Sequence, residues 1–174
     1  MKDISLIAFD ADDTLWECQT YFASVEKEYC DLLKHYAPVE EVSQALFATE
    51  TANMELLGYG SKAFILSLLE NATQVSHGKL TSAEVIAIIK MGKSLLQLPG
   101  KPLEGVITTM EKLRRSGLYR LVVFTKGELL DQESKFNRSG LRTYFDDFIV
   151  VSDKTPEAYE RLCEQFGIGI EELL

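Results

Sequence analysis

An apolar run that ends in clustered acids constrains this chain more than any other feature. The run from Ile4 to Phe9 shows no alternation of polar and apolar residues, and Asp10, Asp12 and Asp13 follow it directly. Strands buried on both faces have this pattern and belong to parallel sheets that are covered by helices. The run therefore predicts the first strand of an α/β sheet, with negative charge gathered where that strand ends.

Later segments continue the α/β pattern. Two further apolar runs, residues 119–125 and 147–152, predict two more buried strands. Residues 102–117 and 155–166 carry apolar side chains at helical spacing, and each segment closes at a glycine in the position of a helix C-cap. Strands that alternate with helices in this way are the signature of an α/β sheet. The expected apolar stripe of 102–117 comprises Leu103, Val106, Ile107, Met110 and Leu113.

Residues 17–100 interrupt this alternation, because a crossover between parallel strands needs only about a dozen residues. Apolar residues recur at helical spacing through the segment, and prolines and glycines punctuate it. We therefore expect a small helical bundle inserted after the first strand. The predicted domains are an α/β core of residues 1–16 and 101–174 and a helical cap of residues 17–100. The helical patterns lie near residues 22–36, 39–57, 61–73 and 81–96.

Composition excludes several classes of function. The 174 residues carry a net charge of −9, which disfavours binding to nucleic acid or to an anionic membrane surface. No apolar run approaches the roughly 18 residues of a membrane span, and the N-terminal run is too short for a signal peptide. The three cysteines form no CxxC pair and predict neither a disulfide framework nor a zinc site. We expect a reduced, cytoplasmic protein without nucleic-acid or membrane partners.

Polar side chains gather at the predicted carboxyl ends of the strands, where open α/β sheets bind ligands. Asp10 and Asp12 follow the first strand, Thr125 ends the second, and Lys154 follows the third just before a helix. Two close carboxylates require a cation or a bound proton, and their hard oxygens favour Mg²⁺. A carboxylate can attack phosphorus while a second acid moves the proton of the leaving alcohol. Thr125 and Lys154 would then hold phosphoryl oxygens.

Each of these residue types also has an ordinary structural role. Aspartates and threonines are common in turns and helix caps, and a lysine after a strand is most often solvated. Asp13 is a candidate for shaping the turn, and Asp153 and Thr155 are candidates for helix caps. Three acids in four positions after a buried run nevertheless favour a functional site at Asp10 and Asp12.

The motif FDADDTLW, residues 9–16, resembles the first motif of the haloacid dehalogenase-like (HAD) hydrolase superfamily, an apolar strand followed by DxDxT. The strand that ends in Thr125 and the helix-preceding Lys154 resemble the motifs that come next in that superfamily. The segment LRTYFDDFIVVSDKTPEAY is similar to its usual approach to the lysine. The resemblance implies a Rossmann-like parallel-sheet core, with residues 17–100 in the position of a helical C1 cap.

The resemblance also implies a role for each site residue. Asp10 would be the nucleophile and a Mg²⁺ ligand, and Asp12 would be the general acid and base, with its backbone carbonyl on the same Mg²⁺. Thr125 and Lys154 would bind the phosphoryl group, and Lys154 would also pair with Asp10. Because the superfamily's dehalogenases lack an acid two positions after the nucleophile, Asp12 favours a phosphatase. It would act on a small phosphorylated metabolite through an aspartyl-phosphate.

The resemblance places the cap as a cover that closes over the substrate. Residues near the nucleophile loop are then candidates for substrate contact, and the two that we single out are Trp16 and Glu17. Packing at the hinge between core and cap is the alternative role, and it is the favoured one for the aromatic side chain.

One motif of the superfamily is missing from the 174 residues. The fourth motif is an acidic pair after the next strand, and it follows a stretch like GIGIEELL, with which this sequence ends. Glu171 and Glu172 resemble the start of a short helix and are no substitute. We therefore expect a C-terminally truncated core whose Mg²⁺ site lacks a third carboxylate. The missing strand would lie beside residues 4–9, which predicts an open apolar edge covered by a dimer partner or a rearranged segment.

Two other interpretations stay open at this point. A catalytically impaired or silent HAD-fold binding protein would be consistent with the missing fourth motif. A signalling receiver domain also gathers Asp, Thr and Lys at the ends of parallel strands, but it has no helical insert after its first strand. Mg²⁺-dependent hydrolysis of a phosphomonoester agrees with more of the residues than either alternative does.

Overall fold

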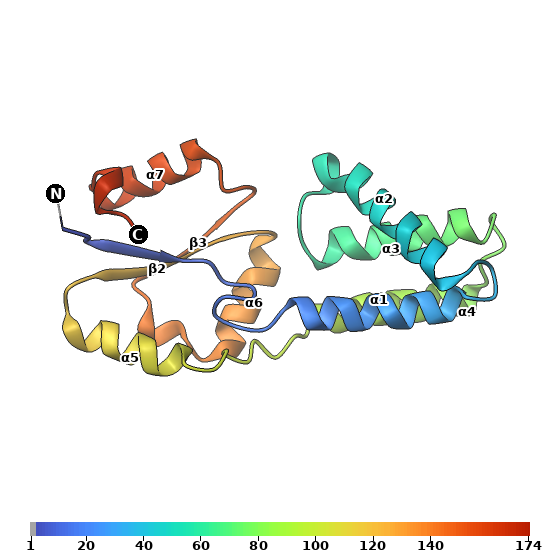
Figure 1. The fold of residues 1–174 in the computed structure, drawn as a ribbon, viewed down its shortest axis with the longest axis horizontal. Coiled ribbons are helices and arrows are strands. Elements are labelled where there is room, and N and C mark those ends of the chain that lie inside the picture. Colours follow the sequence, from blue (N-terminus) through green and yellow to red (C-terminus); the bar gives the residue numbers. More distant parts are fainter. Residues whose placement is uncertain (1–2) are drawn as a thin grey trace. The chain divides into compact units, whose positions relative to one another are not determined.

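The computed structural model describes residues 3–174, which form two compact units. One unit consists of the segment that ends at Cys18 together with Pro99–Leu174, and the other is Gln19–Leu98 (Figure 1). These boundaries lie two residues from those expected from the sequence.

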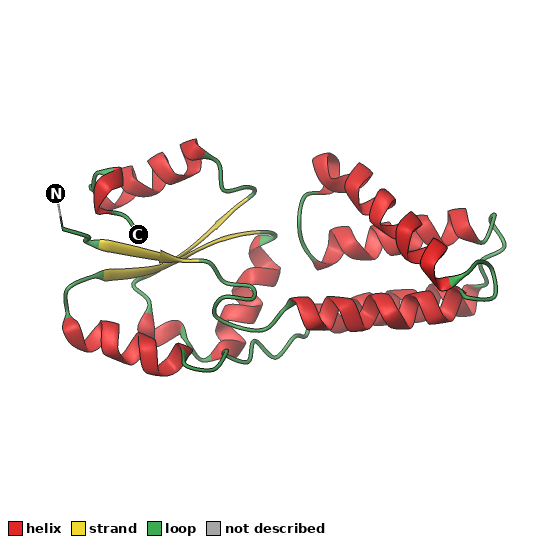
Figure 2. Ribbon diagram, viewed as in Figure 1, coloured by secondary structure: helices red, strands yellow, loops and turns green. Residues whose placement is uncertain are grey.

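Three parallel strands form the sheet of the first unit in the order β1-β2-β3 (Figure 2). The strands are β1 (Leu6–Phe9), β2 (Arg120–Lys126) and β3 (Asp147–Val151). Phe9 at the end of β1 aligns with Val123, and Lys126 at the end of β2 aligns with Val151. The α/β fold class with a parallel sheet is therefore confirmed, and the carboxyl ends of the three strands lie at one edge of the sheet.

Helices cover both faces of this sheet (Figure 1). The helices of the unit are α5 (Val106–Ser116), α6 (Leu129–Ser139) and α7 (Pro156–Phe166), with two short 3₁₀ helices η1 (Arg142–Tyr144) and η2 (Ile170–Glu172). Leu121 and Val123 pack in the core beneath α5 and α6, whereas Val122 and Phe124 pack in the core beneath α7. Burial on both faces explains why the strand sequences show no polar alternation.

Local sequence signals place most of these helices. Thr155 caps α7 through its hydroxyl, which accepts a hydrogen bond from the backbone N–H of Ala158 at 3.3 Å. The predicted stripe of α5 is wrong at one position, because Ile107 is 46% exposed while Met110 is buried. Helix α6 was not predicted from the sequence.

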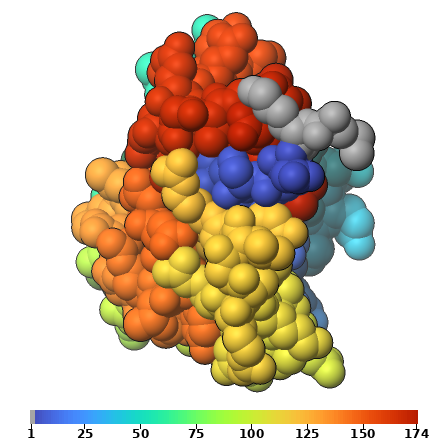
Figure 3. Space-filling view, turned by 90° about the vertical axis from the view of Figure 1, so that its left-hand side faces the viewer, coloured from blue at the N-terminus to red at the C-terminus, as the bar shows by residue number. Residues whose placement is uncertain are grey.

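The C-terminal residues lie beside β1, at the edge for which the sequence predicted coverage by a dimer partner or by a rearranged segment. The backbone N–H of Ser5 donates to the carbonyl of Glu172 at 2.9 Å, and that of Ala8 donates to the carbonyl of Leu174 at 2.7 Å. In Figure 3 the N-terminal segment, in blue, lies next to the red C-terminal segment. The outer edge of β1 is therefore paired in part within the chain itself, and coverage by a dimer partner stays a prediction.

The second unit is a bundle of four helices. They are α1 (Gln19–Leu33), α2 (Val39–Leu57), α3 (Ser61–Val75) and α4 (Ser82–Leu95). Apolar side chains such as Leu46, Leu68 and Ile88 are fully buried between them. The buried hydroxyl of Tyr29 lies 2.6 Å from Oδ1 of Asn71 and 3.0 Å from the carbonyl oxygen of Leu68, which satisfies its hydrogen bonding. None of the helices in residues 3–174 combines the length and the apolar character that crossing a membrane requires.

Candidate functional site

A lysine and an aspartate meet where β1 and β3 end. Lys154, which follows β3, donates from Nζ to Oδ1 of Asp10 at 2.5 Å. The side chain of Asp10 is 43% exposed and that of Lys154 is 21% exposed, so the pair is accessible from solvent. The resemblance to the HAD superfamily implied this pairing, and the parallel sheet produces it because both residues follow the carboxyl ends of their strands.

Thr125 is the penultimate residue of β2, and β2 lies between β1 and β3. It therefore lies on the strand between β1, which leads into Asp10, and β3, which leads into Lys154. Thr125 is 1% exposed, as befits a central strand. Its phosphate-binding role stays a prediction.

A tight turn follows Asp10 and orients the next residues. Asp13 adopts a left-handed backbone conformation with φ of 58°, which Asp tolerates better than most residues. Its Oδ1 accepts a hydrogen bond from the backbone N–H of Cys18 at 2.8 Å, and its own N–H donates to the carbonyl of Trp16 at 2.8 Å. Asp13 therefore shapes the turn, as the sequence analysis proposed.

Asp12 is held by three side chains that the sequence analysis did not assign to it. Nζ of Lys135 lies 2.8 Å from both carboxylate oxygens of Asp12. Gln132 donates from Nε2 to Oδ2 at 2.8 Å, and Trp16 donates from Nε1 to Oδ1 at 2.8 Å. We call Lys135, Gln132 and Trp16 the Asp12 clamp.

The clamp sets the charge state of Asp12. Burial by itself raises the pKa of the Asp12 carboxyl, but the charge of Lys135 and the hydrogen bonds from the clamp outweigh burial and leave the pKa below its ordinary value. Asp12 is therefore ionised at neutral pH. Asp12 also contributes to the high pKa of the nearby Cys18 thiol, about 12, which is caused mainly by burial and keeps this sulfur protonated.

Trp16 is fully buried in the core that lies beneath α5 and α6. Its ring centroid lies 6.2 Å from that of Phe136, and its indole N–H is bonded to Asp12. This corrects the prediction that Trp16 contacts the substrate, because its side chain has no exposed surface; the alternative of packing is the one observed. Glu17 is partly buried, and its substrate contact stays a prediction.

The loop after β1 offers oxygen donors that are suited to Mg²⁺. These are the carboxylate of Asp10 and the backbone carbonyl of Asp12, which belong to the same short turn. Residues 3–174 contain no cluster of three or more His, Cys, Asp or Glu side chains that could hold a metal ion. Mg²⁺ is nevertheless often bound through only one or two protein carboxylates, with waters and substrate phosphate oxygens completing its octahedron. The donor chemistry therefore fits Mg²⁺, with few ligands from the protein.

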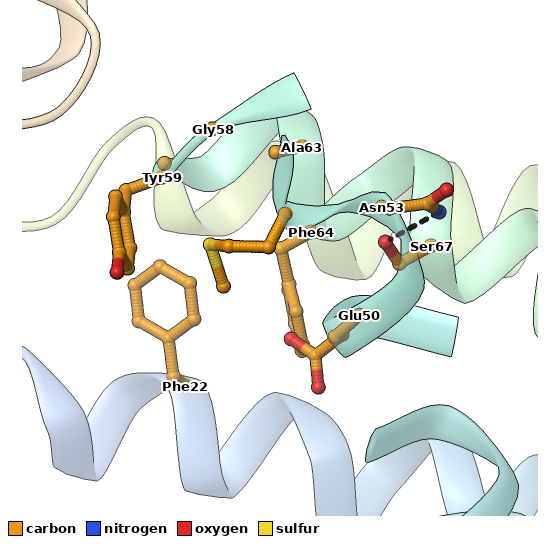
Figure 4. Close-up of a pocket in the computed structure, with 10 residues that line it drawn as sticks. Phe22, Glu50, Asn53, Gly58, Tyr59, Ala63, Phe64 and Ser67 are labelled. Atoms are coloured by element: carbon orange, nitrogen blue, oxygen red, sulfur yellow. Dashed lines mark hydrogen bonds between the residues drawn. The ribbon is translucent and has the colours of Figure 1, made fainter. Parts of the chain in front are cut away.

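The helical unit has a separate hollow of about 160 Å³, lined by residues of α1, α2 and α3 and of the loop between α2 and α3 (Figure 4). Phe22, Tyr59 and Phe64 supply aromatic surface, and Glu50 places a carboxylate at its margin. Burial raises the pKa of Glu50, and the negative charge of Glu26 raises it further. All of these residues belong to the helical unit, so the hollow is formed without the α/β unit.

Comparisons with known proteins identify the family of this fold. The profile of the haloacid dehalogenase-like hydrolases matches residues 4–174. A search of curated proteins gave no match. A haloacid dehalogenase-like family hydrolase from Xanthomonas campestris is 32% identical and superposes with a TM-score of 0.91, over 98% of this chain and 71% of that protein.

Two more distant solved structures share the fold. A protein from Haemophilus somnus, described as a predicted phosphoglycolate phosphatase, is 19% identical with a TM-score of 0.62, over 99% of this chain and 76% of that one. The L-2-haloacid dehalogenase of Xanthobacter autotrophicus is 17% identical with a TM-score of 0.59, over 98% and 68%. At these identities the likeness concerns the fold alone, so the reaction has to be argued from the site.

Proposed function

The chain belongs to the haloacid dehalogenase-like hydrolase family, and from this premise we propose that it hydrolyses the phosphate monoester of a small metabolite with Mg²⁺ as cofactor. One observation carries the proposal: Lys154 contacts Asp10, while a second carboxylate, Asp12, stands two residues further along the same turn. Phosphoryl transfer through a covalent intermediate requires these functional groups: a nucleophile in contact with a cation and an acid–base group beside it.

In the first step, Oδ of Asp10 would attack phosphorus and form an aspartyl-phosphate. The bond from phosphorus to the ester oxygen breaks, and the leaving alcohol takes its proton from Asp12. Asp12 has to bind that proton before this step, because its contacts favour the ionised form. Lys154 would offset the charge of the phosphoryl oxygens at the carboxyl end of β3, and Thr125 would hold them from β2. Bound Mg²⁺, held by Asp10 and the Asp12 carbonyl, would supply charge neutralisation for the phosphoryl group.

In the second step, water would attack the phosphorus of the aspartyl-phosphate. Asp12, now ionised, takes the proton of that water, and the bond from Asp10 to phosphorus breaks to release inorganic phosphate. The contacts of Asp12 favour the ionised form that this step requires. The acid–base role also distinguishes this proposal from dehalogenation, in which no alcohol has to be protonated.

Replacing Asp10 by Asn tests the proposal. We expect the native chain to release phosphate from p-nitrophenyl phosphate only when Mg²⁺ is present, and Asp10→Asn to lose this activity. The isosteric change at an exposed position, Asp3→Asn, is the matched control and should leave the rate unchanged. Mass spectrometry of the acid-quenched native protein should find a phosphoryl group on the peptide that contains Asp10.

Other outcomes would identify the alternatives. Full activity of Asp10→Asn would refute the mechanism. Release of chloride from 2-chloropropionate without release of phosphate would identify a dehalogenase. A chain that binds Mg²⁺ and a phosphate analogue in calorimetry but turns over neither substrate would be a catalytically silent binding protein.

A further inference from the structure

We propose that the Asp12 clamp positions the carboxylate of Asp12 for proton transfer, and that Lys135 is its central positioning residue. This inference rests on the proposed function, in which Asp12 serves the leaving group and then the attacking water. It adds residues of α6 to a site that the motifs place only on the turns after the strands.

The clamp donates hydrogen bonds to both carboxylate oxygens of Asp12. Oδ1 accepts from Trp16 and Lys135, and Oδ2 accepts from Gln132 and Lys135, all at 2.8 Å. Each oxygen therefore accepts from two donors, and the side chain is still 29% exposed, which leaves it accessible for proton transfer. Any rotation of the Asp12 side chain would break at least two of these contacts, which fixes the direction in which its oxygens point.

Lys135 has a costly location for a lysine. Its side chain is only 3% exposed, and the carboxylate of Asp12 is its ionic partner. Buried ion pairs of this kind can often be replaced by apolar side chains without loss of stability. The buried ammonium of Lys135 is therefore better explained by its contacts with the carboxylate of Asp12 than by a contribution to the stability of the fold.

Gln132 supports the same interpretation. Its Nε2 group donates to Asp12 and lies 3.2 Å from the carbonyl oxygen of Lys126, and both of these partners can only accept. The amide orientation is thereby fixed, and it leaves the buried Oε1 of Gln132 without a partner among residues 3–174. An unsatisfied buried oxygen is unfavourable, so the site sacrifices stability to keep an N–H donor on Asp12.

The glycine after β2 makes room for this arrangement. Gly127 has a φ of 137°, which favours glycine, and a Cβ atom there would lie 3.0 Å from Nε2 of Gln132. The clamp thus connects two segments at the edge of the sheet. One is the turn after β1, which carries Asp12 and Trp16, and the other is α6, which follows β2. A catalytic group has to be held within roughly 0.5 Å of its productive position, and this connection provides that restraint.

Two esters that differ in their need for an acid test the positioning role. Phenyl phosphate has a poor leaving group that requires protonation, whereas p-nitrophenyl phosphate has a good one that does not. We expect Lys135→Met to lower kcat/KM for phenyl phosphate at least about tenfold more than for p-nitrophenyl phosphate, because only the first ester depends on Asp12 as an acid. Lys135→Arg should recover part of this difference, and Lys112→Met, an exposed lysine on α5, is the control.

Trp16 provides a readout that is independent of activity. It is the only tryptophan of the chain, so its indole N–H gives a single side-chain resonance in a ¹H–¹⁵N spectrum. Because this N–H donates to Asp12, Lys135→Met and Gln132→Leu should shift the resonance and speed its hydrogen exchange. Lys112→Met should change neither property.

The outcomes separate this inference from the proposed function. If the native chain hydrolyses both esters but Lys135→Met and Gln132→Leu slow them equally, or not at all, the positioning role is refuted. Faster hydrolysis of phenyl phosphate by Lys135→Met would also refute it, because the clamp would then restrain Asp12 from acting. If the native chain hydrolyses neither ester, the proposed function fails, and an unchanged Trp16 resonance in both variants would refute the clamp separately.

Discussion

Replacing Gly92 by Ala should reveal how closely α3 and α4 approach in the helical unit. A Cβ atom at Gly92 would lie 2.1 Å from Cγ1 and 2.8 Å from Cδ1 of Ile65. Ile65 is β-branched and sits in a helix, where essentially one χ1 rotamer is available, so its Cγ1 atom cannot turn aside easily. Overpacking of this kind costs about 1–3 kcal/mol.

Helix propensity acts in the opposite direction. Ala is about 0.5–1 kcal/mol more favourable than Gly within a helix. The net expectation for Gly92→Ala is therefore a loss of up to about 2.5 kcal/mol in the free energy of unfolding, because the overpacking cost is at least as large as the gain in helix propensity. Urea denaturation followed by circular dichroism measures this quantity, since the four helices dominate the signal of the unit.

A double-mutant cycle provides the control. In an Ile65→Ala background the two clashing atoms are gone, and the 3.2 Å contact with Cβ of residue 65 remains. Gly92→Ala should then be neutral or stabilising by up to about 1 kcal/mol, which gives a coupling of about 1–3 kcal/mol between the two positions. The same loss from Gly92→Ala in both backgrounds would refute the close approach of the two helices.

Two further predictions concern pH and a helix cap. Because the pKa of Glu50 is raised in the folded chain by burial and by Glu26, its ionised form opposes folding, and this penalty disappears as the pH falls through the folded pKa. Glu50→Gln should therefore raise Tm at neutral pH, and the difference in Tm from the native chain should shrink toward about pH 4. The control is Glu55→Gln at an exposed position. A difference in Tm that does not depend on pH would contradict this reasoning. Thr155→Ala should cost about 1 kcal/mol of unfolding free energy, because the N-cap of α7 is lost. Thr155→Ser should retain most of that stability, and equal losses in the two variants would show that the hydroxyl is not the cause.

Much of the fold could be predicted because it depends on local patterns. Helices cover both faces of the three strands, so each strand appears in the sequence as a mainly apolar run without polar alternation. The helices of the inserted unit bury mainly apolar side chains at helical spacing, which the sequence shows directly. The sequence also predicted that Asp10 and Lys154 lie at the same edge of the sheet, since both follow parallel strands, and their direct pairing was implied by the family resemblance.

Helix α6 could not be found in this way, because its buried face is not apolar. Asp131, Gln132, Lys135 and Ser139 are all buried together with Phe136. Hydrophobic periodicity assumes that buried residues are apolar, and it therefore fails at a helix that turns polar groups inward. The exposed Leu129 and Leu130 strengthen the misleading pattern, since they are apolar and face away from the core.

By itself, the sequence determined the class of fold and the two aspartates on which the proposed chemistry depends. Those features arise from residues that are close in the chain and from strand ends that a parallel sheet aligns. Only the tertiary structure decided which donors surround Asp12, because Gln132 and Lys135 lie more than 100 positions away and no local pattern links them to it. It also decided that Trp16 faces the core and not the substrate. The partly buried carboxylate of Asp12 is bound by donors that are close to it in space, and they come close only once α6 is packed against the sheet.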